Sequence, residues 1–182
     1  SCHSDKPHPE GIKANDHTDK VACQTCHIPE FARVNPTKMY WDWSTAGRLN
    51  DENKPIVEKD ENGWMTYHGK KGTFVWEMNV EPEYFWFNGT ILNVMADDII
   101  DPTDTVVLTE VVGDMADANS RIYPFKVHRG KQPYDKVLNT LVIPHLFGKD
   151  PDAYWKSYDW DKAITHGMEY AGQDFSGVYG CV

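Results

Sequence analysis

The sequence predicts an α+β fold with much irregular structure, in which short helices accompany a few strands. Prolines and glycines interrupt the first 50 residues so often that only short helical turns fit there. Two later stretches have the patterns of β-strands. Residues 105–112 are rich in β-branched and apolar residues, and residues 121–128 alternate between apolar and polar residues. After Asp150-Pro151, apolar residues recur at helical spacing until Gly172.

The elements follow from these patterns in order along the chain. Glu61-Asn62-Gly63 is a turn signal, so the polar stretch 51–72 is a surface loop or a weak hairpin. The polar residues 113–120 separate the two strand-like stretches, and we therefore expect an antiparallel β-hairpin over about 105–128. The helix is expected over about 151–170, with Asp150 as its N-cap.

The composition excludes some classes of protein. The chain has 182 residues and a formal net charge of −10, which argues against a nucleic-acid partner because such proteins carry a basic surface. No apolar stretch approaches the roughly 18 residues of a membrane helix, so no membrane span is expected in this chain.

Cys23-Gln24-Thr25-Cys26-His27 is a complete C-x-x-C-H motif, the attachment sequence of c-type haem. Two thiols at this spacing reach the two vinyl groups of one haem, and His27 then supplies an axial nitrogen to the iron. A zinc site would need a second C-x-x-C or a matching pair of histidines, which the sequence lacks. The motif therefore predicts at least one covalent haem c, and it places maturation outside the cytoplasm.

The two ends of the chain are open to two interpretations. Cys2-His3 has the form of the end of a second haem motif, in which Cys2 would hold the haem and His3 would bind its iron. Cys181-Val182 has the form of the start of another motif. In the alternative, a Cys2–Cys181 disulfide closes a domain with a single haem, which an oxidising compartment permits.

These motifs suggest three segments within one larger multihaem domain. Residues 1–50 form a haem-binding segment, residues 51–104 a loop-rich aromatic segment, and residues 105–182 the hairpin with the C-terminal helix. The 13% of aromatic residues would suit the covering of porphyrin faces, or else a small core built from bulky side chains.

Eight histidines are many for this length, and each is a candidate axial ligand in a haem protein. His27 and His3 follow cysteines and are the candidates for the proximal position. The candidates for the second axial position on a haem iron are His17, His8, His128 and His145. His68 has the surroundings of a surface residue, and His166 is a partial cation near the end of the predicted helix.

A local cationic cluster stands out in this acidic chain. Its members are Arg121, Lys126, His128, Arg129 and Lys131. Such a cluster would attract a small anionic substrate.

Several stretches of the sequence resemble the octahaem cytochromes c of the tetrathionate reductase family. They are residues 1–8 (SCHSDKPH), 21–33 (VACQTCHIPEFAR), 41–47 (WDWSTAG) and 120–134 (SRIYPFKVHRGKQPY). The resemblance extends over most of the chain, although the chain has one complete haem motif where the family has eight. The chain is therefore expected to be a segment of a longer protein.

The resemblance implies a periplasmic reductase of tetrathionate, nitrite or hydroxylamine, in which a lysine holds the distal side of the active-site haem. Lys126 is our first choice for that lysine and Lys131 the second, with His128 and Arg121 completing the predicted catalytic set. Redox proteins or a quinol-linked donor would supply the electrons. In the alternative function, the protein is a non-enzymatic electron carrier in which two histidines bind every haem iron.

Overall fold

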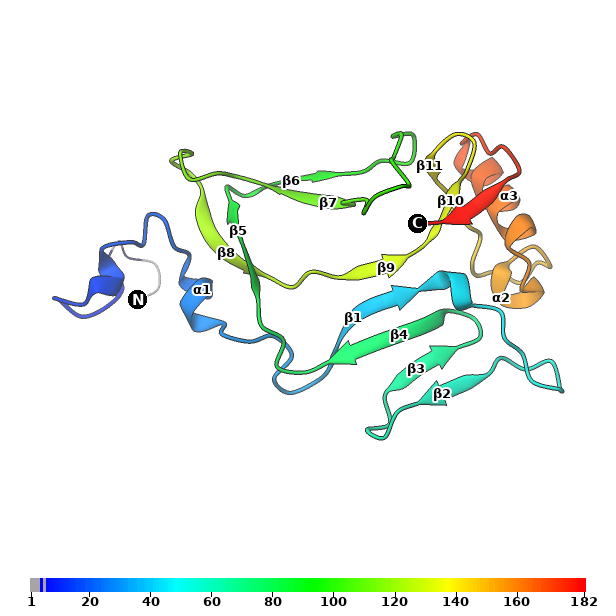
Figure 1. Cartoon of the computed structure of the whole chain (residues 1–182), viewed down its shortest axis with the longest axis horizontal. Coiled ribbons are helices and arrows are strands. Elements are labelled where there is room, and N and C mark those ends of the chain that lie inside the picture. Colours follow the sequence, from blue (N-terminus) through cyan, green and yellow to red (C-terminus); the bar gives the residue numbers. More distant parts are fainter. Residues whose placement is uncertain (1–3, 5) are drawn as a thin grey trace. The chain divides into compact units, whose positions relative to one another are not determined.

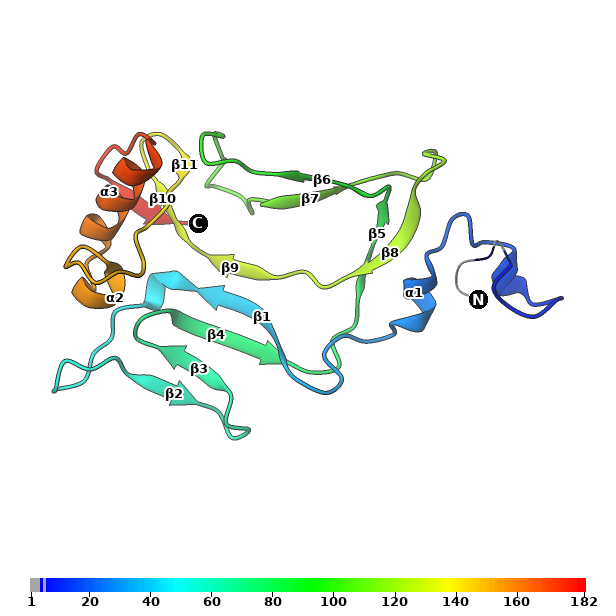
Figure 2. The same cartoon turned by 180° about the vertical axis from the view of Figure 1, so that it is seen from behind.

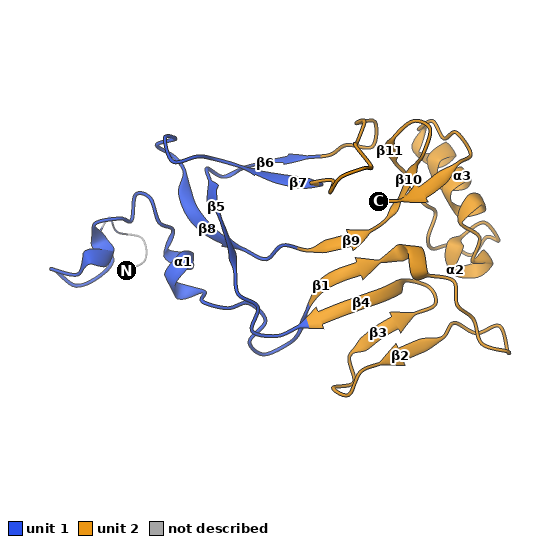
Figure 3. Ribbon diagram, viewed as in Figure 1, with its two compact units in different colours: residues 1–37, 77–93, 108–127 blue, residues 38–76, 94–107, 128–182 orange. Residues whose placement is uncertain are grey.

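The computed structural model describes residue 4 and residues 6–182, so Cys2 and His3 lie outside the described residues. The chain divides into two compact units, coloured separately in Figure 3. Unit 1 comprises residues 1–37, 77–93 and 108–127, and unit 2 comprises residues 38–76, 94–107 and 128–182. Each unit is therefore assembled from segments that lie far apart in the sequence.

Unit 1 combines short helical turns with two antiparallel strand pairs. The strand β5 pairs with β8, and β6 pairs with β7. Contacts between aromatic rings support the first pair, because Phe87 packs edge-on against both Tyr123 and Phe125 with ring centroids 5.5 Å apart. The elements are η1 (Lys13–Asn15), α1 (Cys23–His27), β5 (Glu83–Phe87), β6 (Thr90–Asn93), β7 (Thr109–Val112) and β8 (Arg121–Phe125).

The hairpin expected over 105–128 is wrong in its pairing, although strands do form within both predicted stretches. Residues 113–120 are not its turn. They form a loop inserted between β7 and β8, and the side chain of Asp117 secures it by accepting hydrogen bonds from Asn88 and Ser120. Both strands instead pair with the segment 83–93, and aromatic side chains of β5 pack against those of β8.

Unit 2 contains a five-stranded sheet in the order β2-β3-β4-β1-β9 and a three-stranded sheet in the order β11-β10-β12. Gly72 has φ of 87°, and a Cβ there would collide with the carbonyl oxygen of Asp42, so only glycine lets β4 begin this close to β1. The strands are β1 (Thr37–Asp42), β2 (Val57–Lys59), β3 (Met65–His68), β4 (Gly72–Glu77), β9 (Arg129–Lys131), β10 (Pro133–Asp135), β11 (Thr140–Leu141) and β12 (Tyr179–Cys181).

Of the two possibilities for residues 51–72, the weak hairpin is the one observed. β2 and β3 pair antiparallel, and the side chain of Asp60 accepts hydrogen bonds from the backbone of Asn62 and Trp64 at the turn. The stretch 51–104, for which the sequence indicates loops, contains all of β2 to β6.

The predicted C-terminal helix is present but begins later and is interrupted. Two helices form, α2 (Tyr154–Ser157) and α3 (Trp160–Ala171), and Tyr158 between them adopts the left-handed conformation. Asp159 caps α3, whereas the carboxylate of Asp150 accepts hydrogen bonds from the backbone of Asp152 and Ala153 in the preceding turn. Gly172 ends α3 as predicted.

The core of unit 2 lies between α3 and the three-stranded sheet, which are side by side in Figures 1 and 2. Ile164 and Met168 of α3 are buried against Val142, and Phe175 and Tyr179 pack around them. The α+β fold class with much irregular structure is thus confirmed. None of the helices in the described part of the chain has the length and apolar character of a membrane span.

Candidate haem site and cationic strands

The C-x-x-C-H motif forms the short helix α1, which is fastened to unit 1 by one side. The backbone of Ala22 donates a hydrogen bond to the carbonyl oxygen of Ile122 in β8 (3.1 Å), and the hydroxyl of Thr25 donates to the same oxygen (2.6 Å). Ala22 is buried, whereas Cys23, Cys26 and His27 are exposed, and both thiols are free. The side chains that thioether attachment requires are therefore left accessible.

His8 lies opposite His27, and their ring planes are within 10° of parallel with centroids 6.2 Å apart. Bonds between metal and imidazole nitrogen are about 2 Å long, so two rings that bind one ion from opposite sides have centroids roughly 6 Å apart. Asn15 exchanges hydrogen bonds with the backbone of His8, while Nδ1 of His8 is buried and unpartnered among the described residues. The residues present thus fit a haem bound between His27 and His8.

The predicted cationic cluster is divided between the two units. Arg121 and Lys126 belong to unit 1, where they hydrogen-bond to the Thr18 carbonyl oxygen and the Thr37 hydroxyl, respectively. The other three members, His128, Arg129 and Lys131, belong to unit 2.

In unit 2, the parallel pairing of β9 with β1 sets Arg129 beside Tyr40 and Lys131 beside Asp42. The ring nitrogen Nδ1 of His128 lies 3.2 Å from the carbonyl oxygen of Lys38. We call the residues Lys38, His128, Arg129 and Lys131 the cationic strand pair.

Lys38 is a further candidate site residue that the sequence did not single out. Its ammonium group lies 3.5 Å from the ring centroid of Trp41, 4.1 Å from that of Phe74 and 5.3 Å from that of Trp76. Burial lowers the pKa of Lys38, and the positive charge of Lys71 lowers it further. The alternating aromatic residues around positions 41 and 74 were the available signal, but only the strand pairing shows which lysine they surround.

Comparison with known proteins identifies the family. The sequence profile described as "Cytochrome c bacterial" matches residues 38–182, which is most of the chain. The chain belongs to the bacterial cytochrome c family.

A solved structure of octahaem cytochrome c from Shewanella oneidensis matches this cytochrome with a TM-score of 0.88 and 48% sequence identity. The match covers 100% of this chain and 41% of the Shewanella chain, so this chain spans less than half the length of that protein. No curated protein matches the chain. The expected resemblance to octahaem cytochromes is confirmed, and this chain is a multihaem c-type cytochrome whose cofactor is covalently bound haem c.

The remaining histidines of the cytochrome lie in different settings. His17 and His128 are exposed, and His68 is half-buried rather than on the surface. His145 is half-buried and its Nε2 lies 3.0 Å from both carboxylate oxygens of Asp150. This hydrogen bond lowers the pKa of Asp150 to about 2. From the sequence, Asp150 was expected only to cap a helix.

Cys181 lies at the end of β12, opposite Pro133 of β10, and carries a free thiol. Partial burial of its sulfur raises the pKa of the thiol, and the nearby carboxylate of Asp42 raises it further. Cys181 is therefore in an extended strand, unlike Cys23, which begins a helix.

Proposed function

We propose that this cytochrome is a segment of a periplasmic reductase of small oxidised anions and related molecules, such as tetrathionate, nitrite or hydroxylamine. The observation that carries the proposal is the cationic strand pair, with Lys38 of lowered pKa within it, in a chain whose net charge is −10. A concentrated positive potential on an acidic protein attracts anions to that place.

In this proposal, the thiols of Cys23 and Cys26 would hold one haem, and His27 and His8 would supply nitrogen ligands to its iron. When bound, haem c supplies a one-electron redox centre, and at an open axial position it also supplies a place for substrate. If His8 and His27 both held the haem of this segment, this part of the chain would conduct electrons and leave the reaction to another haem of the full protein.

A lysine that binds a metal ion must first lose its proton, so a lowered pKa favours that role. The aromatic rings around Lys38 stabilise its cation, whereas burial and Lys71 favour the neutral amine, and the net effect is a lowered pKa. Lys38 thus satisfies this requirement, and we place it ahead of Lys126 and Lys131 as the candidate distal lysine.

The other members of the cationic strand pair would bind the substrate and supply a proton. Arg129 and Lys131 would hold the anion, and the imidazole of His128 could deliver a proton to it. Electrons would come from a redox protein or a quinol-linked donor through stacked haems.

The test uses the natively purified, haem-loaded parent protein. We expect its reduced form to bind carbon monoxide at one haem and to be reoxidised by tetrathionate, nitrite or hydroxylamine. Lys38→Met should change both the fraction that binds carbon monoxide and the rate of reoxidation at least tenfold, and Lys126→Met should change them less. Lys59→Met, which alters an exposed lysine of β2, is the control.

The second candidate function is that of an electron carrier without a substrate site, and the parallel arrangement of His8 and His27 favours it. If no haem of the parent protein binds carbon monoxide and none of the three substrates reoxidises it, the reductase proposal is wrong and the carrier function stands.

A further inference from the structure

We propose that His145, Asp150 and His166 form a binding site for one divalent transition-metal ion of the Zn²⁺ type, in addition to the haem sites. The three side chains come from the loop before α2 and from the middle of α3. Each offers a ligand atom, and these atoms all lie within 4.8 Å of one another.

One edge of the coordination polyhedron is already formed. Two ligands of a tetrahedral metal ion with bonds of about 2 Å lie about 3.3 Å apart, and Nε2 of His145 lies 3.0 Å from either oxygen of Asp150. The ring of His166 faces that of His145, with centroids 4.7 Å apart. His166 is half-buried, with 44% of its side chain exposed, so it has the freedom to rotate the remaining distance.

The backbone holds these ligands in place without the ion. The His145 N–H donates to the Ala163 carbonyl oxygen in α3 (2.8 Å), and the His145 carbonyl oxygen accepts from Tyr154 N–H (2.9 Å). A Cβ at Gly167 would collide with the carbonyl oxygen of Ile143, so glycine next to His166 lets α3 approach the loop closely.

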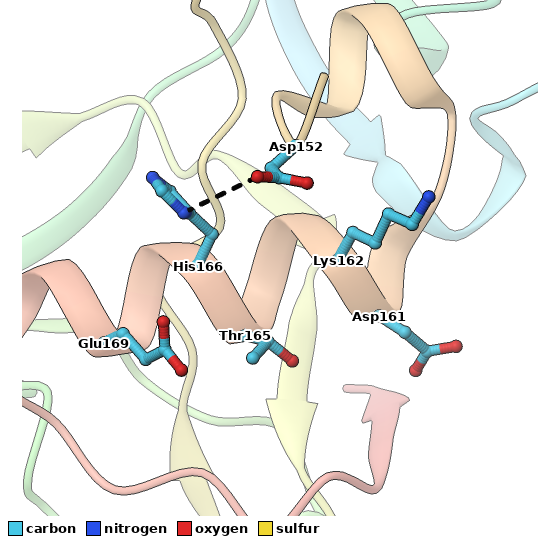
Figure 4. Close-up of a pocket in the computed structure, with 6 residues that line it drawn as sticks. All are labelled: Asp152, Asp161, Lys162, Thr165, His166 and Glu169. Carbon is cyan, nitrogen blue, oxygen red and sulfur yellow. Dashed lines mark ion pairs between the residues drawn. The ribbon is translucent and has the colours of Figure 1, made fainter. Parts of the chain in front are cut away.

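A second carboxylate lies at the same place. Figure 4 shows Asp152 facing His166, with Oδ2 of Asp152 at 4.0 Å from Nδ1 of the ring. Asp150 and Asp152 together would balance the charge of a divalent ion. A cavity of about 360 Å³ borders His145, Asp150 and His166, which leaves room for water to complete the coordination.

The ligand types narrow the class of ion. Two imidazoles with carboxylate suit Zn²⁺, Ni²⁺ or Cu²⁺, whereas Mg²⁺ and Ca²⁺ prefer sites made only of oxygen. Zn²⁺ is the probe for the test because it does not take part in electron exchange with the haems.

The experiment titrates the haem-loaded parent protein, freed of loose metal by chelator, with ZnCl₂ and follows the heat of binding. Metal analysis after dialysis counts the bound ions. We expect His166→Ala and His145→Ala each to remove one equivalent of zinc or to weaken its binding about 100-fold. Thr165→Ala alters an exposed neighbouring position of α3 and is the control. This variant should bind zinc with the same stoichiometry and affinity as the unaltered protein.

Two results would overturn the proposal. In the first, the His166→Ala protein keeps its full zinc content and affinity while its far-ultraviolet circular dichroism is unchanged. In the second, either histidine variant alters the visible haem spectrum of the zinc-free protein, which would assign that histidine to a haem iron. A variant that loses its fold would be replaced by His166→Gln, which keeps a polar side chain of similar size on α3.

Discussion

His68 lies half-buried in β3 with two lysines nearby. Its Nδ1 accepts a hydrogen bond from the backbone N–H of Lys70 (3.0 Å). Burial lowers the pKa of His68 below the ordinary 6.5, and the charges of Lys71 and Lys70 lower it further. The unfolded chain therefore takes up a proton at a higher pH than the folded protein does, and stability is lost as the pH falls below 6.5.

We expect His68→Asn to reduce this loss of stability, since the Asn side-chain oxygen can still accept from Lys70 but does not titrate. The measurement is the difference in melting temperature between about pH 7.5 and pH 5, which should be smaller in the variant. Lys71→Gln should reduce the difference partly. If the difference in melting temperature between the two pH values is the same in all three proteins, His68 does not cause the loss of stability at low pH.

Asp135 is fully buried at the end of β10, where its carboxylate accepts four hydrogen bonds. Burial by itself would raise its pKa, but the hydrogen bonds, led by that from the Ser176 N–H, lower it overall. The donors are the backbone N–H groups of Val137, Leu138 and Ser176 and the hydroxyl of Ser176.

Asp135→Ala should lower the free energy of unfolding by about 3 kcal/mol, because buried donors would lose their acceptor. Asp135→Asn keeps one accepting oxygen and should cost less. Urea unfolding followed by circular dichroism measures both. If Asp135→Ala is as stable as the unaltered protein, the hydrogen bonds accepted by the Asp135 carboxylate do not stabilise the fold as described.

At the scale of the elements, α3 contributes Ala163, Ile164 and Met168 to the fully buried apolar side chains of unit 2. Ile164→Ala should lower the free energy of unfolding by about 3 kcal/mol, because removing buried methyl and methylene groups leaves a cavity beside Met168. Thr165→Ala, one position along on the exposed side, should change it by about 0.5 kcal/mol or less. If the two variants are equally stable, α3 does not pack as described.

Elements with local signals could be predicted from the sequence, and pairings could not. Gly172 ends α3 where the pattern placed the end of the helix, but the N-cap of α3 is Asp159 and not the predicted Asp150. The partners of β7 and β8 lie about 20 and 40 positions earlier in the chain, and local patterns do not connect them.

The same distinction applies to the candidate sites. The haem motif is local and was predicted. The setting of Lys38 and the grouping of His166 with His145 and Asp150 were not, since residues from separate strands or from a loop and a helix define them.

At the scale of the whole molecule, this chain spans 41% of the Shewanella octahaem protein that it matches. We expect the intact mass of the natively purified, denatured parent protein to exceed the mass of its bare chain by several covalent haems, because thioether bonds survive denaturation. Treatment that removes non-covalent haem should leave that excess unchanged. A single haem per protein would contradict the multihaem assignment.

The anchoring of α1 to Ile122 bears on how the protein matures. A helix of five residues is too short to persist alone, and the partner that fixes it comes 97 positions after Thr25. We therefore expect the C-x-x-C-H segment to lack a stable helix until β8 has been synthesised. Folding in this order would give the attachment machinery a flexible segment first and a fixed helix with exposed thiols afterwards.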